Sequence, residues 1–175
     1  MKVGITGTPG TGKSAVCEII QKYYPVIDLN RLIEEKKFYT EKDRERNTLV
    51  TDTDALAKYV LNYSKHWDVQ QTTIFEGHLA HYLPLDMVIV LRASPSELRR
   101  RLSKKGFGEA KIKENIEAEA LDVILVEALE RHENVHEIDT SEKDVNEVVN
   151  CIVEIINGSD KYHPGSIDWN GELFG

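Results

Sequence analysis

One stretch near the start of the chain, GTPGTGKS at positions 7–14, constrains the fold more than any other. The apolar run Val3–Thr6 before it predicts a buried strand, and the residues after it place apolar side chains at helical spacing. Glycines in such a loop let successive backbone N–H groups point at one anion, and the positive end of the following helix adds to the attraction. We therefore expect a phosphate-binding P-loop between the first strand and the first helix.

The eight residues fit the pattern G-x-x-x-x-G-K-[ST], which assigns roles to its polar positions. Lys13 is expected to reach the β- and γ-phosphates of ATP, and the Ser14 hydroxyl to ligate Mg²⁺. The loop residues expected to surround the phosphates are Gly7, Gly10, Thr11 and Gly12. The alternative interpretation is a glycine-rich turn that binds nothing. Because a strand is predicted before the loop and a helix after it, we favour the nucleotide-binding interpretation.

Two classes of P-loop protein do not fit the rest of the sequence. A GTPase would carry a D-x-x-G switch after a strand and an N-K-x-D base reader, and the sequence has neither. A large motor or helicase needs more chain than these 175 residues, which suit one domain with a hydrophobic core. A small phosphoryl-transfer enzyme remains.

Short apolar or β-branched runs alternate with helical patterns and predict five strands, at residues 3–6, 26–27, 72–75, 87–91 and 135–138. Because parallel strands need crossover connections, this alternation predicts an α/β fold, a five-stranded parallel sheet with helices on both faces. Residues 111–131 are expected to form one long helix, whereas residues 39–53 show no clear period. The tail at 159–175 is expected to be an extension that becomes ordered on contact.

Two residues after the third predicted strand are candidates for catalysis. Glu76 ends that strand, and a carboxylate beside the P-loop strand commonly holds the shell of Mg²⁺, directly or through water. His78 follows two residues later and could orient an attacking water or a phosphate. The alternatives are an exposed carboxylate at a strand end and a loop histidine with its hydrogen bonds satisfied.

Basic residues supply further candidates. Arg92 ends the fourth predicted strand and is expected to clamp the charge that develops on the transferred phosphoryl group. Three consecutive arginines, residues 99–101, cannot all face one way on a helix, and Arg101 is the preferred one. The segment Lys104–Gly108 suits a small lid that closes over phosphates, the alternative being a plain turn with surface lysines. A loop around Thr140–Lys143 is expected to read adenine.

Charge, hydropathy and cysteine content limit the binding partners and the cell compartment that we expect for this protein. The formal net charge of −8 disfavours a broad direct grip on nucleic acid. No apolar run approaches the roughly 20 residues that a membrane span needs, and a strand pattern begins where a signal peptide would lie. Cys17 and Cys151 are far apart and are expected to be buried apolar residues in a reducing compartment. We expect a cytoplasmic protein.

Further motifs accompany the P-loop: IDLNRL, EGH with a following P-x-D, VLRAS, KKGF with K-x-x-EN-x-x-AE, and GSIDW. Together they resemble, over essentially the whole chain, the adenylate kinase family of the CINAP type (adenylate kinase isoenzyme six), and its archaeal branch more closely. The resemblance implies a nucleoside monophosphate (NMP) kinase fold in residues 1–157. It also implies an NMP-binding segment at 28–51, a short lid at 104–114 and a C-terminal extension at 158–175.

The resemblance also implies function. It suggests a broad-specificity NMP kinase that converts ATP and AMP to two ADP, with a slower ATPase activity. It further implies a role in maturing the small ribosomal subunit, at the 3′ end of its rRNA, through transient binding of a platform ribosomal protein. By position, Gly10, Gly12, Lys13, Ser14, Ala15 and Lys105 would contact ATP, and Asp28, Leu29 and Gly77 the acceptor.

Three positions depart from the family's pattern. Glu76 stands where the family often has aspartate, and Lys105 replaces a lid arginine, which keeps the charge but loses the bidentate fork. Glu34 stands where some members carry an arginine on the NMP helix. These departures give weight to ATP hydrolysis as the main activity. A kinase for another small metabolite is a third interpretation.

Overall fold

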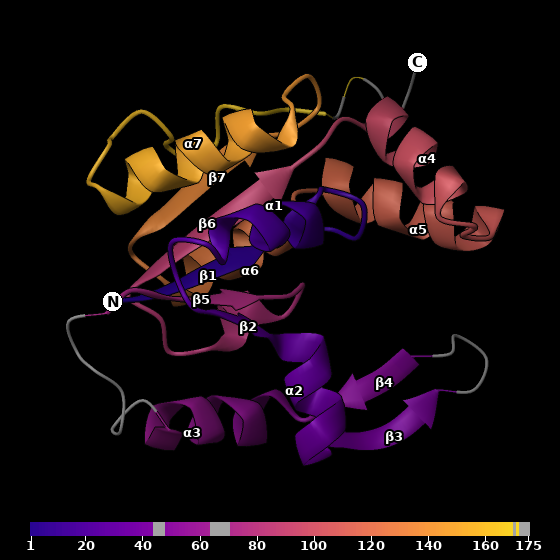
Figure 1. Cartoon of the computed structure of the whole chain (residues 1–175). Helices are drawn as coiled ribbons and strands as arrows, with labels where there is room; N and C mark the ends of the chain where they lie inside the picture. Colours follow the sequence, from indigo (N-terminus) through magenta and orange to yellow (C-terminus); the bar gives the residue numbers. More distant parts are fainter. Residues whose placement is uncertain (44–47, 64–70, 170, 172–175) are drawn as a thin grey trace.

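A parallel five-stranded sheet forms the centre of the molecule, in the order β2-β5-β1-β6-β7 (Figure 1). The computed structural model describes residues 1–43, 48–63, 71–169 and 171. The strands are β1 (Lys2–Thr6), β2 (Val26–Asp28), β5 (Thr73–Glu76), β6 (Met87–Arg92) and β7 (Val135–Asp139). The parallel sheet predicted from the sequence is thus confirmed. β1 lies in the middle, so the P-loop leaves the centre of the sheet.

Helices cover both faces of this sheet, as predicted. Helices α1 (Lys13–Ile20) and α7 (Val145–Ile156) pack on one face, where Val3 and Ile5 join the largest core cluster. The short 3-10 helix η2 (Ala80–Tyr82) and α6 (Val123–Arg131) pack on the other face. Gly4 faces η2, since a Cβ there would lie 3.5 Å from the Ala80 Cβ, and it would also lie 2.5 Å from the side chain of Leu85, which follows η2. Among the described residues, no helix has the length and apolarity to cross a bilayer.

A separate lobe extends from the β2 edge of the sheet (Figure 1). It contains α2 (Leu29–Lys36), an antiparallel pair β3 (Tyr39–Asp43) and β4 (Thr48–Thr51), and α3 (Thr53–Tyr63). The Asp28 side chain caps α2 by accepting from the Arg31 N–H at 3.2 Å, and buried Leu29, Ile33, Leu56 and Val60 form the core of this lobe with Phe75. Residues 39–53 show no clear period in the sequence because the strands there are only five and four residues long, too short for an alternation to stand out.

The expected long helix at 111–131 is wrong. The structure has two helices there, α5 (Glu109–Ala120) and α6, separated at Asp122, whose φ of 55° is left-handed. Before them, α4 (Pro95–Lys104) begins at a capping residue, the Ser94 hydroxyl, which accepts from the Glu97 N–H at 3.3 Å. Figure 1 shows α4 and α5 side by side at one end of the sheet.

The described part of the tail lies along the outer edge of β7. The Glu137 N–H donates to the Tyr162 carbonyl at 3.1 Å. The N–H groups of Ser166 and Ile167 donate to Glu137 Oε1 at 2.7 and 3.2 Å. The tail is therefore ordered by contact with the sheet, as expected. Of the two cysteines, Cys17 is buried as predicted, whereas Cys151 is only half-buried.

Candidate active site

The P-loop connects β1 to α1 and has the backbone shape that its glycines allow. Gly7 has φ +139°, and a Cβ there would lie only 2.3 Å from the Leu91 carbonyl oxygen, so no larger residue fits. Gly12 caps α1 with φ +100°. The Lys13 ammonium donates to the carbonyl oxygens of Gly7 at 2.7 Å and Thr8 at 3.1 Å. The lysine is thus held inside the loop, where phosphate oxygens could replace these carbonyls.

The charge state of Lys13 reflects its burial. Desolvation lowers the pKa of this ammonium to about 8, although the neighbouring carboxylates of Glu76 and Glu119 raise it. A buried ammonium is poorly compensated by carbonyl oxygens alone. An anionic ligand beside the ammonium would therefore raise the pKa of Lys13 back toward its ordinary value.

Oxygen donors that suit a magnesium ion gather beside Lys13. The Ser14 hydroxyl donates to Glu76 Oε1 at 3.2 Å, and Asp28 pairs with Glu76 in the register of β2 and β5. Desolvation first, and then the negative charge of Asp28, raise the pKa of Glu76. A hydroxyl and two carboxylates are the hard ligands that Mg²⁺ prefers, and a divalent cation would relieve the repulsion between the carboxylates. Ser14 and Glu76, the two residues predicted for the metal, therefore fit it, and Asp28, predicted for the acceptor, adds a second carboxylate.

A pocket of about 650 Å³ opens on one side of the first turn of α1. Its walls include Gly10, Gly12 and Ala15 from the P-loop side, Arg101 and Lys105 from α4 and its end, and the loop 140–145 after β7. This loop is the one expected to read adenine. The pocket, called the donor pocket below, is large enough for a nucleoside and its first phosphates.

A second pocket of about 470 Å³ opens on the other side of the same turn. It is lined by Ser14, Cys17, Glu18, Gln21, Val26, Ile27, Asp28, Arg31, Leu32, Glu35 and Glu76. We call it the acceptor pocket. Its described charged side chains are four carboxylates and Arg31, whose Nε donates to Glu35 at 2.7 Å. The acceptor pocket is therefore acidic.

Three more residues were predicted near the acceptor: Leu29 after β2, and Gly77 and His78 in the loop after β5. Gly77 approaches Leu29 so closely that a Cβ would lie 3.1 Å from the Leu29 Cβ. Leu29 itself is buried in the core of the lobe, so its side chain does not line the acceptor pocket. His78 is exposed, yet desolvation by the protein around it, and then the charge of Lys13, lower the pKa of its imidazole to about 4. His78 is therefore neutral at physiological pH.

Arg101 lies against the P-loop, on the side of the donor pocket. Its guanidinium donates to the Gly10 carbonyl at 3.3 Å and to Thr140 Oγ1 at 3.0 Å, and Glu97 accepts from its Nε at 2.6 Å. Lys105 is exposed at the end of α4 and lines the same pocket. The choice of Arg101 among three consecutive arginines agrees with this geometry, since Arg99 and Arg100 are exposed.

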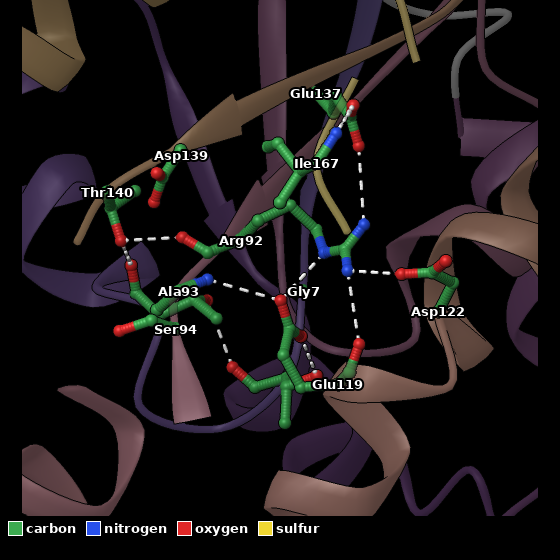
Figure 2. A network of polar contacts seen from close by, with 12 residues as sticks. Gly7, Arg92, Ala93, Ser94, Glu119, Asp122, Glu137, Asp139, Thr140 and Ile167 are labelled. Carbon is green, nitrogen blue, oxygen red and sulfur yellow. Dashed lines mark hydrogen bonds and ion pairs between the residues drawn. The ribbon is translucent and has the colours of Figure 1, made fainter. Parts of the chain in front are cut away.

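The structure does not bring Arg92 to the phosphate site. Its side chain is only 1% exposed and points into a cluster of carboxylates from Glu119, Asp122 and Glu137 (Figure 2). A guanidinium enclosed in this way has no donor directed at a ligand. The expected clamp on the transferred phosphoryl group is therefore corrected to a structural ion cluster, called the Arg92 cluster below.

The sequence assigned no role to Thr8, a residue of the P-loop, or to Glu119, which contacts Thr8 from α5. The Thr8 hydroxyl donates to Glu119 Oε2 at 2.5 Å, and both side chains are buried. The one available signal was the motif EN-x-x-AE, whose last residue is Glu119. Thr11 is also buried, and its hydroxyl donates to the Thr8 carbonyl at 3.0 Å, so it shapes the loop through its side chain.

Comparison of the sequence with known proteins gives matches along nearly all of the chain. A family model described as an AAA domain matches residues 3–122. A protein of Methanosarcina barkeri described as "Putative adenylate kinase" is 44% identical, and the match covers 97% of this chain and 97% of that protein. One of Archaeoglobus fulgidus with the same description is 43% identical, and the match covers 99% of this chain and 94% of the relative.

Solved structures share the arrangement of helices and strands. A shikimate kinase from Bacteroides thetaiotaomicron matches with a TM-score of 0.61 at 17% identity, over 90% of this chain and 98% of that one. A deoxyadenosine kinase from M. mycoides with bound dATP matches with a TM-score of 0.57 at 19% identity, over 90% and 100% of the two chains. At such low identity the likeness shows the fold alone.

Proposed function

Because the chain belongs to the family of these archaeal adenylate kinases, we propose that it transfers the γ-phosphoryl group of ATP to a nucleoside monophosphate. AMP is the expected acceptor, so that ATP and AMP yield two ADP. The observation that carries this proposal is the position of the two pockets. They open on opposite sides of the first turn of α1, with Ala15 lining one and Ser14 the other. A transferase needs two ligand sites that meet at the phosphates.

The residues around the two pockets have separable roles in this reaction. Lys13 Nζ would exchange its carbonyl partners for phosphate oxygens and neutralise the charge that develops during transfer. Arg101 and the loop after β7 would hold the nucleoside of ATP in the donor pocket. Ser14, Glu76 and Asp28 would hold Mg²⁺, which when bound would neutralise the β- and γ-phosphates. His78, being uncharged, would orient a phosphate or water by hydrogen bonding rather than by charge.

The transfer needs no covalent intermediate. An oxygen of the acceptor's phosphate attacks the γ-phosphorus in line, the bond to the β–γ bridging oxygen breaks, and ADP leaves from the donor pocket. The attacking phosphate is already anionic, so no general base has to remove a proton. Closure of the expected lid at 104–114, which carries Lys105, would exclude water from the phosphates.

ATP hydrolysis is the second candidate function, and the acidity of the acceptor pocket favours it. Glu18, Asp28, Glu35 and Glu76 line this pocket, and its one described cation, Arg31, already pairs with Glu35. Side chains at 41–49 belong to the expected NMP segment but lie outside the described part. If the acceptor's phosphate is bound weakly, water attacks the γ-phosphorus in its place.

The resemblance to the CINAP type extends this second candidate to ribosome assembly. ATP binding and hydrolysis would then drive capture and release of a basic ribosomal protein of the small subunit, which the net charge of −8 would attract. The test is a pull-down of ribosomal proteins with and without Mg-ATP. A partner retained equally in both conditions would contradict a nucleotide-driven switch.

Chromatography of nucleotides distinguishes the two activities. The protein is incubated with Mg-ATP, with and without AMP, and Lys13→Ala serves as the inactive control. If the protein is a kinase, AMP is consumed and two ADP form for each ATP consumed. If the protein is an ATPase, ADP and phosphate form slowly and the amount of AMP does not change. Turnover that survives in Lys13→Ala would overturn both.

A further inference from the structure

Glu119 is a buried carboxylate that the proposed reaction does not use. It lies near the end of α5, and only 3% of the residue is exposed. Its Oε2 accepts from the Thr8 hydroxyl at 2.5 Å. Its Oε1 accepts from Arg92 Nε at 2.7 Å and from the Ala93 N–H at 3.1 Å (Figure 2). Each carboxylate oxygen thus has a fixed partner, and one of these partners belongs to the P-loop.

The other side of Glu119 is anchored to the body of the protein. Arg92, which ends β6, donates to the Glu119 carbonyl at 3.1 Å and to Glu137 Oε2 at 3.3 Å, and it also pairs with Asp122. Charge-assisted bonds of this kind are stronger than neutral ones, and burial shields them from water. Arg92 therefore holds the Glu119 carboxylate in one orientation.

The position of Thr8 determines the shape of the loop around Lys13. The Thr8 carbonyl accepts from Lys13 Nζ at 3.1 Å, from the Thr11 hydroxyl at 3.0 Å and from the Thr11 N–H at 3.2 Å. The peptide that carries this carbonyl belongs to the stretch whose N–H groups must face the phosphates. A shift of the Thr8 side chain would turn that stretch and move the partners of Lys13.

We propose that Glu119 is a positioning residue, which fixes the P-loop through Thr8 in the shape that binds ATP. The inference rests on the proposed use of ATP, and it gives the EN-x-x-AE motif a physical role. It also assigns an indirect role to Arg92: the arginine holds the carboxylate that holds the loop. Because the expected lid at 104–114 includes the first turns of α5, and Glu119 lies near the end of the same helix, one helix connects the lid to the P-loop.

The test compares Thr8→Val, which removes the hydroxyl at nearly constant shape, with Thr8→Ser, which keeps it. The dissociation constant of Mg-ATP is measured by calorimetry, and the melting temperature without ligand is measured in parallel. We expect Thr8→Val to weaken ATP binding about tenfold or more, from loss of a buried bond to a charged group. Thr8→Ser should restore binding to within about twofold of the original chain. Glu119→Gln should weaken binding in the same direction.

Leu125→Ala is the control for stability alone, because Leu125 is buried (4% exposed) in a core cluster with Val88 and Val90 that contains no residue of the P-loop or of the Arg92 cluster. It should lower the melting temperature and leave the dissociation constant of Mg-ATP unchanged. A Thr8→Val protein that melts earlier but binds Mg-ATP as tightly as the original chain would overturn the positioning role. Failure of the original chain to bind Mg-ATP would instead overturn the proposed function, and this inference with it. AMP is absent throughout, so the identity of the acceptor does not affect the result.

Discussion

Arg92→Met should cost several kcal/mol of folding free energy. The guanidinium is 1% exposed, and its removal leaves Glu119 and Glu137, each 3% exposed, without their cation. Methionine fills similar volume, so the main cost is the uncompensated charge rather than a cavity. Breaking a buried pair from one side costs about 3–5 kcal/mol. For a chain of this length each kcal/mol lowers the melting temperature by about 2–4 °C, so we expect a fall of about 6–20 °C.

Urea unfolding followed by circular dichroism measures this loss, and the control is Arg99→Met. The Arg99 side chain is 50% exposed, and it pairs with Glu109, whose side chain is 72% exposed, so its removal should cost less than about 1 kcal/mol. A loss below about 1 kcal/mol in Arg92→Met, with turnover abolished, would refute the structural role and restore the catalytic clamp.

Three further predictions concern the P-loop and the metal ligands. Without ligand, the pKa of Lys13 is about 8, so above pH 8 its side chain is mostly neutral. Because bound phosphates favour the ammonium, ATP binding above pH 8 takes up a proton. The affinity for ATP should then fall up to about tenfold per pH unit above pH 8, and a constant affinity between pH 7 and 9.5 would contradict this assignment. Glu76→Gln removes a carboxylate whose raised pKa shows that its charged form is disfavoured. Turnover should fall at least about tenfold while the melting temperature stays equal or rises, and a lower melting temperature with full turnover would contradict the metal role. Gly7→Ala should lose at least about 2 kcal/mol in urea unfolding because its Cβ meets the Leu91 carbonyl, whereas Gly108→Ala, with open space around it, should change stability by less than about 0.5 kcal/mol.

Features set by short stretches of sequence could be predicted. The P-loop needs only its own glycines, its lysine and the elements on either side, and the structure has β1 and α1 where these were expected. Helix α7 is also readable from the sequence of 145–156, because its apolar residues repeat at helical spacing and Asp144 and Glu147 form a capping box at its start. The contact of Ser14 with Glu76 was foreseeable as well, because the carboxyl ends of neighbouring parallel strands meet at one edge of the sheet.

The failed prediction for Arg92 depends on contacts that no local pattern contains. The side chain at the end of a strand points to one face of the sheet or the other. The carboxylates that pair with Arg92 belong to Glu119, Asp122 and Glu137, which are 27, 30 and 45 residues away along the chain. A sequence shows that an arginine follows an apolar strand near a P-loop, which is equally typical of a catalytic clamp and of a structural cation. Only the fold shows that three carboxylates already surround it.

The failed prediction of one long helix at 111–131 has the same origin. Glu119 and Asp122 are three residues apart, a spacing that is typical of one helix face. In the structure both contact Arg92, Glu119 from within α5 and Asp122 from the left-handed turn that ends it. Aspartate accepts this conformation more readily than most residues, and its contact with the guanidinium offsets the cost. The break in the helix and the burial of Arg92 are thus two consequences of one ion cluster, and that cluster also holds Thr8 of the P-loop through Glu119.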